Sequence, residues 1–199
     1  MKKVLSVLLC STFVCFYGGA VSASEINGTE PFNLIEYCEN HEVHSEEELE
    51  SVLYPYIGES DPTNTNESNN QDTVVSFDLT IDYENQYVIT TTVYEQNDLR
   101  SSKSGSAEKK YRNNLGFVVF KVRVDGTFSY NGSTCSTTSA SATFTPSPLS
   151  GWSSSPSASS GKSGSKAYAR AYGTAVNGGS SQSYSVYLYC DVNGNLTTA

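Results

Sequence analysis

The chain has 199 residues with 21 acidic and 12 basic side chains, which gives a formal net charge of −9 at pH 7. That length allows one domain of ordinary size with an additional segment, and the negative charge with dispersed basic residues argues against nucleic-acid binding. Both histidines precede residue 45, so the rest of the chain has no histidine to activate a serine or cysteine nucleophile, and we expect neither an enzyme nor a cofactor.

Residues 1–23 have the pattern of a bacterial export signal. Lys2 and Lys3 precede an apolar run from Val4 to about Tyr17, and small residues end at Ala23. The run is shorter than the roughly 20 apolar residues that a membrane-spanning helix needs. We therefore expect cleavage after Ala23 and a secreted protein, extracellular or loosely associated with the cell surface, without a transmembrane anchor.

Residues 24–72 are predicted to be an acidic, partly helical appendage and linker. From Ser24 to Leu99 there are 18 acidic and no basic side chains, whereas from Arg100 to Ala199 there are 10 basic and 3 acidic ones. In one interpretation the acidic segment is a solvated spacer, and in the other it is a removable mask folded onto the basic half.

One short helix is expected within this appendage. Ser45, followed three residues later by Glu48, forms a capping box, and Leu49, Val52 and Leu53 follow at helical spacing. The polar stretch from Gly58 to Asp72 cannot bury enough apolar surface to offset its ordering entropy, so it is predicted to be a linker.

From Val75 onwards the apolar period is two, as in a half-buried strand. The alternating apolar positions are Val75, Phe77, Leu79, Ile81 and Tyr83. A hairpin that pairs Tyr83 with Tyr87 sets Ile81 opposite Ile89 and Phe77 opposite Val93, and this hydrophobic matching predicts that register.

A second long strand is predicted to end at Tyr130 and to run through Gly126 as a bend or bulge, because Asp125-Gly126 as a tight turn would pair apolar with polar positions. A turn at Asn131-Gly132 pairs Tyr130 with Ser133 and Phe128 with Cys135, which points Cys135 into the core.

A strand of small residues is expected over 133–145. The serine- and glycine-rich stretch 146–165 is predicted to lack regular structure.

The last hairpin is predicted over 166–176 and 182–192. Cys190 shares the apolar face of its second arm, as Cys135 shares that of its own strand, so we expect a Cys135–Cys190 disulfide. Cys38 is then a free thiol or an intermolecular link.

About six or seven strands indicate an all-β protein, an antiparallel β-sandwich of immunoglobulin-like general shape over residues 73–199, with the strand order left open.

The polar face of this hairpin is the candidate ligand-binding surface. Tyrosine rings with hydroxyl edges suit stacking on sugars or docking on proteins, so a cell-envelope glycan or a surface protein is the expected partner. A purely structural role, covering a sheet edge, is the alternative. The residues are Tyr168, Arg170, Tyr172, Tyr187 and Tyr189.

Cys38, His41 and His44 form a cluster of soft metal ligands. Their spacing matches no standard zinc pattern, and we expect no metal site.

Turn, core and cysteine positions between about Lys110 and Leu196 have a recognisable pattern: Tyr111, Leu115 to Val122, Gly126 to Gly132, Cys135, Trp152, Ser160-Gly161, Cys190 and Asn193 to Leu196. This stretch resembles an uncharacterised domain of proteins exported by Gram-positive Firmicutes. The resemblance implies secretion and an all-β fold, and it implies no activity. The acidic segment lies outside it.

These patterns together predict a secreted, non-catalytic binding or surface-associated protein. A secreted hydrolase is one alternative, which two converging carboxylates in a cleft would favour. A masked effector, released when the acidic segment is removed, is the other.

Overall fold

The computed structural model describes residues 31–58, 72–96, 102–148 and 150–198. The helices and strands described belong to one compact unit within residues 32–199. The predicted export signal at residues 1–23 and most of the predicted linker at 58–72 lie outside the described residues.

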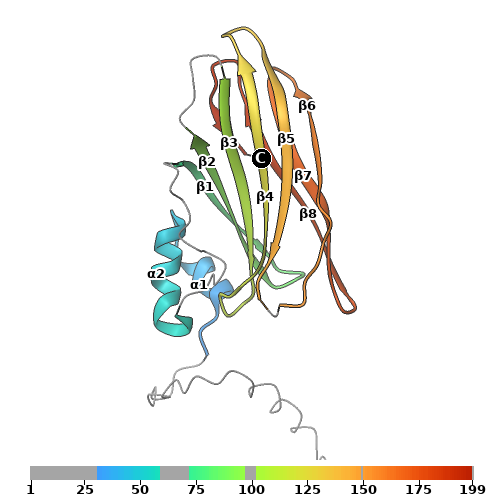
Figure 1. The fold of residues 1–199 in the computed structure, drawn as a ribbon. Helices are drawn as coiled ribbons and strands as arrows, with labels where there is room; N and C mark the ends of the chain where they lie inside the picture. Colours follow the sequence, from blue (N-terminus) through green and yellow to red (C-terminus); the bar gives the residue numbers. More distant parts are fainter. Residues whose placement is uncertain (1–30, 59–71, 97–101, 149, 199) are drawn as a thin grey trace, which may run out of the picture. The chain divides into compact units, whose positions relative to one another are not determined.

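Two antiparallel sheets pack face to face, and two short helices precede them in the chain (Figure 1). The helices are α1 (Leu34–Asn40) and α2 (Glu46–Ile57). The five-stranded sheet contains, in spatial order, β1 (Thr73–Asp82), β2 (Tyr87–Gln96), β3 (Ser102–Arg112), β4 (Val118–Tyr130) and β5 (Cys135–Pro146). The four-stranded sheet contains β6 (Ser157–Ser163), β7 (Lys166–Asn177), β8 (Ser180–Cys190) and β9 (Leu196–Thr197).

The predicted all-β sandwich with a short helical segment before it is confirmed. Each sheet is a meander in which consecutive strands are neighbours. Such pairing needs only short turns and local contacts, which explains how strands of modest apolar content can assemble.

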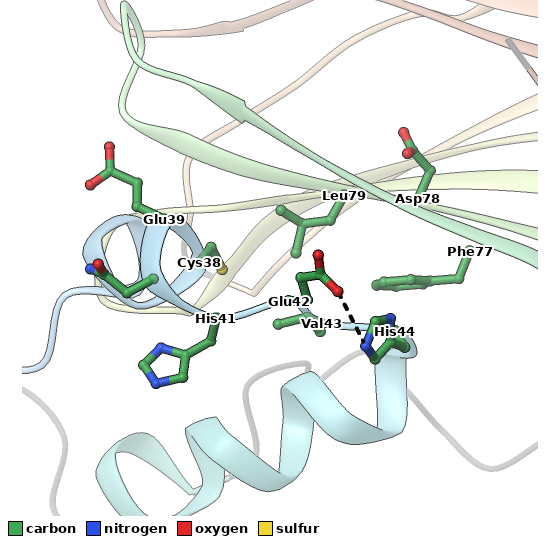
Figure 2. Close-up of a pocket in the computed structure, with 10 residues that line it drawn as sticks. Cys38, Glu39, His41, Glu42, Val43, His44, Phe77, Asp78 and Leu79 are labelled. Atoms are coloured by element: carbon green, nitrogen blue, oxygen red, sulfur yellow. Dashed lines mark ion pairs between the residues drawn. The ribbon is translucent and has the colours of Figure 1, made fainter.

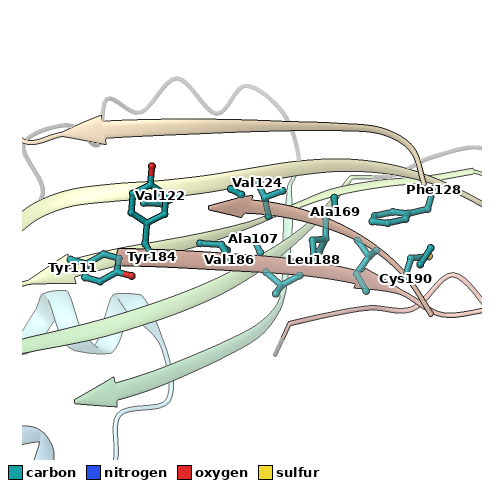
Figure 3. Close-up of a cluster of buried hydrophobic side chains, with 14 of the residues drawn as sticks. Ala107, Tyr111, Val122, Val124, Phe128, Ala169, Tyr184, Val186, Leu188 and Cys190 are labelled. Carbon is teal, nitrogen blue, oxygen red and sulfur yellow. The ribbon is translucent and has the colours of Figure 1, made fainter. Parts of the chain in front are cut away.

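The main core lies between the two sheets (Figure 3). Alternate residues of β4 are buried from Val118 to Phe128, and among them Val122 and Val124 lie in this core, together with small residues of β7 and larger ones of β8 such as Leu188. A Cβ atom at Gly126 would lie 2.9 Å from the Cβ of Ala169. Glycine at this position therefore allows the sheets to approach closely.

β4 passes through Asp125-Gly126 without a turn, as predicted, and a register shift follows between Thr127 and Phe128. The next turn differs from the prediction, because Tyr130 pairs with Cys135 rather than with Ser133. Because side chains alternate between the two faces of a strand, a shift of two residues leaves each side chain on the same face, so Cys135 still points inward.

The predicted disulfide between Cys135 and Cys190 is absent from the structure. Both are free thiols in the main core, 2% and 0% exposed, so their predicted inward orientation is confirmed while the covalent bond is not found. The two cysteines belong to different sheets, and the Cys190 thiol donates a hydrogen bond to the Asp191 carbonyl oxygen at 3.5 Å. Burial, with the neighbouring Cys135 thiol, raises the pKa of Cys190 to about 12.

The first β-hairpin has a register that differs by one residue from the predicted one. Asp82 pairs with Tyr87 and Ile81 with Val88, so Ile81 does not lie opposite Ile89. Since successive side chains of a strand point to opposite faces, this shift turns the apolar side chains of β1 away from the core between the sheets.

The loop of this hairpin explains the shift. Residues Tyr83–Gln86 form the turn, and Gln86 has a left-handed φ of 59°. The Asp82 carboxylate accepts hydrogen bonds from the backbone N–H and the side-chain amide of Asn85, at 3.1 and 2.9 Å. These local hydrogen bonds stabilise a loop of one residue more than hydrophobic matching predicted.

The helices form a second core on the outer face of the five-stranded sheet. Two apolar side chains of β1 pack into it together with residues of α1 and α2. Its buried residues are Leu34, Ile35, Leu49, Leu53 and Val88, with Leu79 and Ile81 packed against them. Residues 32–58 are therefore packed on the sheet, and the predicted domain boundaries at residues 23 and 72 stay predictions.

The predicted helix start at Ser45 is confirmed, with one difference from a standard capping box. The Ser45 side chain accepts a hydrogen bond from the Glu48 backbone N–H at 3.1 Å, whereas the Glu48 carboxylate accepts one from the backbone N–H of His44, the residue before the N-cap, at 2.8 Å. α1 was not predicted, and its N-cap is Asn33, whose side chain accepts from the Ile35 backbone N–H.

β6 lies in the stretch predicted to lack regular structure, so that prediction is wrong for residues 157–163. These residues pair with β7, from Ser157 opposite Tyr172 to Ser163 opposite Lys166. β6 is the edge strand of its sheet. Backbone hydrogen bonds to β7 stabilise the strand, although its serine and glycine side chains contribute little apolar burial.

Candidate functional site

The five residues predicted to bind a ligand lie together on the outer face of the four-stranded sheet. Their neighbours along β7 and β8, such as Ala169 and Leu188, are buried in the main core, so strand alternation turns the five side chains away from it. We call this group the tyrosine surface: Tyr168, Arg170, Tyr172, Tyr187 and Tyr189.

Three rings of the tyrosine surface contact one another. Tyr187 and Tyr189 are stacked with centroids 5.5 Å apart and an interplanar angle of 8°. Tyr168 meets both edge-on, with centroids 5.7 Å from Tyr187 and 6.1 Å from Tyr189. These are favourable aromatic geometries, so the rings form an ordered group on a rigid sheet.

Arg170 lies between two tyrosines of the same surface. Its guanidinium carbon is 4.6 Å from the ring centroid of Tyr172 and 5.0 Å from that of Tyr187. Its Nε donates a hydrogen bond to the Ser185 hydroxyl at 2.9 Å. Cation–π attraction and this hydrogen bond hold the guanidinium in place, while Tyr172 remains 37% exposed.

Gly161 of β6 provides space for the Tyr168 ring. A Cβ atom at this position would lie 2.7 Å from the Tyr168 hydroxyl oxygen and 2.9 Å from the ring carbon that bears it. The edge strand β6 therefore sets the position of a ring on the neighbouring strand β7.

A separate pocket of about 520 Å³ lies where the turn between α1 and α2 meets β1 (Figure 2). Its lining includes Cys38, Glu42, His44, Phe77 and Asp78. Glu42 is 91% exposed at its side chain and lies 3.9 Å from His44 Nε2. Burial raises the pKa of the Cys38 thiol to about 11, so this sulfur is protonated at neutral pH.

The possible metal ligands of this region do not converge. Among the described residues, no group of three or more His, Cys, Asp or Glu side chains is arranged to hold a metal ion. The His41 ring is stacked on Tyr37 at 4.3 Å, and its Nδ1 is 3.0 Å from the Tyr37 carbonyl oxygen. Figure 2 shows His41 and His44 pointing in different directions.

A buried charge cluster joins α2 to β3, and the sequence reasoning missed it. The Arg112 side chain is fully buried, and its Nη2 lies 2.6 Å from both Glu46 Oε1 and Glu50 Oε1. Lys110 lies 2.9 Å from the same Glu46 oxygen, and Arg112 also donates to the Thr90 hydroxyl. The acidic run at the start of α2 gave no signal for this cluster, because acidic side chains in a first helical turn are stabilised by the helix dipole and need no basic partner.

The electrostatics of this cluster favour ionised groups. Burial opposes ionisation of Glu46, but attraction to Arg112 and Lys110 outweighs it and holds the pKa of Glu46 below its usual value. Burial likewise opposes the charge of Arg112, and Glu46 and Glu50 outweigh it and raise the Arg112 pKa. The cluster is therefore a charged contact that fastens the helices to the sheet.

Comparison with protein-family models, curated proteins and solved structures gave no match for the chain. The resemblance to exported Firmicutes proteins therefore stays a prediction from the residues alone. Among the described residues, no helix is long and apolar enough to cross a membrane.

Proposed function

We propose that this is a secreted, non-catalytic binding protein whose tyrosine surface contacts carbohydrate of the cell envelope. The observation that carries the proposal is the gathering of four tyrosines and one arginine on a single outer sheet face, with the rings in mutual contact. Aromatic rings with hydroxyl edges stack on the apolar faces of sugars and hydrogen-bond to their hydroxyl groups.

The arrangement of the surface supports binding more than catalysis. The rings belong to paired strands, so their positions are set before a ligand arrives and little conformational entropy is lost on binding. The polar groups around them are hydroxyls, such as those of Ser183 and Ser185, and these can accept and donate hydrogen bonds to a polysaccharide.

Secretion is part of the proposal and rests on residues 1–23, whose sequence pattern is that of an export signal. Expression in a Gram-positive host tests it. We expect the protein in the culture medium or the wall fraction with a new amino terminus at Ser24, whereas an intact Met1 terminus in the cytoplasm would contradict it.

The binding proposal is tested by co-sedimentation with insoluble envelope fractions. Each of Tyr172→Ala and Tyr187→Ala is expected to weaken binding about 3- to 10-fold, which corresponds to the loss of one aromatic contact. Tyr54→Ala is the matched control, because Tyr54 is 70% exposed on α2 and outside the tyrosine surface. Equal binding by all three variants would contradict the proposal.

A masked effector is the second candidate, and one observation favours it: acidic residues of α2 pair with Arg112 of the basic half. The helices, however, cover the outer face of the five-stranded sheet, whereas the tyrosine surface is on the four-stranded sheet. A mask of this kind would cover a different surface from the one proposed to bind carbohydrate. The hydrolase alternative has no comparable support, since the carboxylates of Glu39, Glu42 and Asp78 in this pocket point in different directions in Figure 2.

A further inference from the structure

We propose that the ligand of the tyrosine surface is an anionic polysaccharide, and that the Arg170 guanidinium receives its carboxylate or phosphate group. This inference rests on the proposed carbohydrate-binding function and adds the chemistry of the ligand.

Arg170 differs from the other arginines that the structure describes. Arg112 pairs with Glu46 and Glu50, and Arg123 lies 2.8 Å from Asp125. Within the described residues, Arg170 has cation–π contacts and one hydrogen bond from Nε, and no ion pair with a carboxylate. Its terminal nitrogens are therefore available to a charged group from outside.

The charges around Arg170 favour an anion. From residue 126 to residue 190 the sequence contains Lys162, Lys166 and Arg170 and no aspartate or glutamate. Lys166 is on the same face of β7 as Arg170, because the two are four residues apart on one strand. Lys162 pairs with the buried Ala167 and so lies on the opposite face of the sheet, and Lys166 is within electrostatic range of Asp191. Among the described residues, Arg170 is therefore the cation of this face without a neighbouring carboxylate, and its charge is complementary to a negatively charged ligand and raises its association rate.

The geometry of Arg170 suits a planar or tetrahedral oxyanion. A guanidinium presents its donors in a rigid fork that matches two oxygens of a carboxylate or phosphate. The two flanking rings and the Ser185 hydroxyl hold this fork in one orientation, so less rotamer entropy is lost when it binds.

The surroundings favour a polysaccharide over an acidic peptide. Peptides are recognised through an open sheet edge or through pockets for side chains, whereas the tyrosine surface lies on the outer face of β7 and β8. Beside this surface β7 is paired with β6, and β8 is paired with β9 at Tyr189 and Cys190. Stacked rings beside a fixed cation match a sugar ring that carries an acidic substituent.

The test uses the full secreted chain and four defined polymers of similar length. Polygalacturonate offers carboxylates, phosphorylated dextran offers phosphates, dextran is neutral, and poly-glutamate represents an acidic peptide. We expect the wild type to bind polygalacturonate or phosphorylated dextran at least 10-fold more tightly than dextran or poly-glutamate, with affinity falling as salt is added. The better of the two anionic polysaccharides identifies the source of the charge.

The variants identify the residue. Arg170→Gln is expected to lose about 10-fold or more in affinity for the anionic polysaccharide, the size of a charge-assisted hydrogen-bond pair, and Arg170→Lys to lose part of it, since it keeps the charge without the fork. Lys162→Gln removes an exposed cation of β6 in the same sheet and is expected to bind within 2-fold of wild type. Thermal unfolding of each variant checks that the fold is retained, and Arg170→Lys supplies the comparison if Arg170→Gln is unstable.

Three outcomes would overturn the inference, and they differ in what they leave standing. Equal binding to dextran and the anionic polymers, with Arg170→Gln unaffected, would reject the anionic ligand but keep carbohydrate binding. Preference for poly-glutamate would reject the polysaccharide in favour of an acidic peptide. Binding to none of the polysaccharides would reject the inference and the proposed function together.

Discussion

At the scale of single residues, Gly161 links the edge strand to the tyrosine surface. The Tyr168 ring occupies the space where any other side chain at residue 161 would begin. Because the Tyr168 hydroxyl is the far end of a flexible side chain, the ring can move without disturbing the backbone. A substitution here should therefore change the surface more than the fold.

Gly161→Ala is expected to displace the Tyr168 ring and to weaken carbohydrate binding about 3-fold, with a change in the free energy of unfolding of less than about 1 kcal/mol. Ring resonances of Tyr168 in NMR spectra and polymer binding measure the two effects. Ser163→Ala, an exposed position of the same strand, is the control. A large loss of stability without a shift of the ring would show that the glycine serves the strand instead.

At the scale of secondary-structure elements, α2 is fastened to the sheet by apolar contacts and by a buried charge cluster. Leu49 and Leu53 are fully buried, and Glu46 and Glu50 each precede one of these leucines by three residues and are four residues apart on the same side of the helix. The fully buried Arg112 depends on these two carboxylates, since removing the partners of a buried charge costs several kcal/mol.

The double substitution Glu46→Gln and Glu50→Gln is expected to destabilise the docked helices by about 3 to 5 kcal/mol, because it leaves the Arg112 charge buried without a carboxylate. Chemical denaturation and limited proteolysis within α2 measure the loss. Glu47→Gln is the matched control, since Glu47 is exposed on the same turn of the helix. If the double variant were as stable as this control, the charge cluster would contribute nothing to docking.

At the scale of the whole described unit, the five-stranded sheet separates two cores. The main core depends on apolar side chains from both sheets, whereas the smaller one, between the sheet and the helices, also includes the Glu46 ion pairs. The two cores therefore respond differently to pH, since protonation of Glu46 affects only the smaller one directly.

Acidification is expected to release the helices before the sandwich unfolds. The pKa of Glu46 in the folded protein lies below its ordinary value of 4.5, so its contribution to stability is present above about pH 4.5 and is lost as the pH falls through the lower, folded value. Between pH 5 and pH 2 we expect binding of a hydrophobic dye and proteolysis at α2 while the β-sheet circular dichroism signal persists. Simultaneous loss of both signals would contradict two separable cores.

Much of the sandwich and the candidate surface could be predicted from local alternation. Because side chains alternate between the two faces of a strand, the sequence predicted that Cys135 and Cys190 point inward. It likewise predicted that Tyr168, Arg170 and Tyr172 share the outer face. The turn before Cys135 was predicted with an error of two residues, and an even shift leaves each side chain on the same face. The capping box at Ser45 likewise identified α2, because its hydrogen bonds are local.

β3 illustrates what local patterns miss. It is a central strand, yet its sequence is mostly Ser, Lys, Gly and Glu, and only Ala107 and Tyr111 carry an apolar signal toward the main core. Its opposite face holds Lys110 and Arg112, which are buried only because α2 brings carboxylates to them. A polar segment with the composition of a loop can therefore form a central strand when carboxylates from a helix distant in sequence neutralise its buried basic side chains.

The sequence by itself determined the two-sheet class, the position of α2 and the faces of β7 and β8, because hydrophobic alternation and helix capping act between near neighbours in the chain. Only the tertiary structure decided which face of β1 is buried and whether Cys135 and Cys190 are bonded. The first depends on a single residue in the loop before β2 and on the helices that cover Ile81. The second depends on the separation of two sulfur atoms across two sheets, a distance that no pattern along the chain encodes.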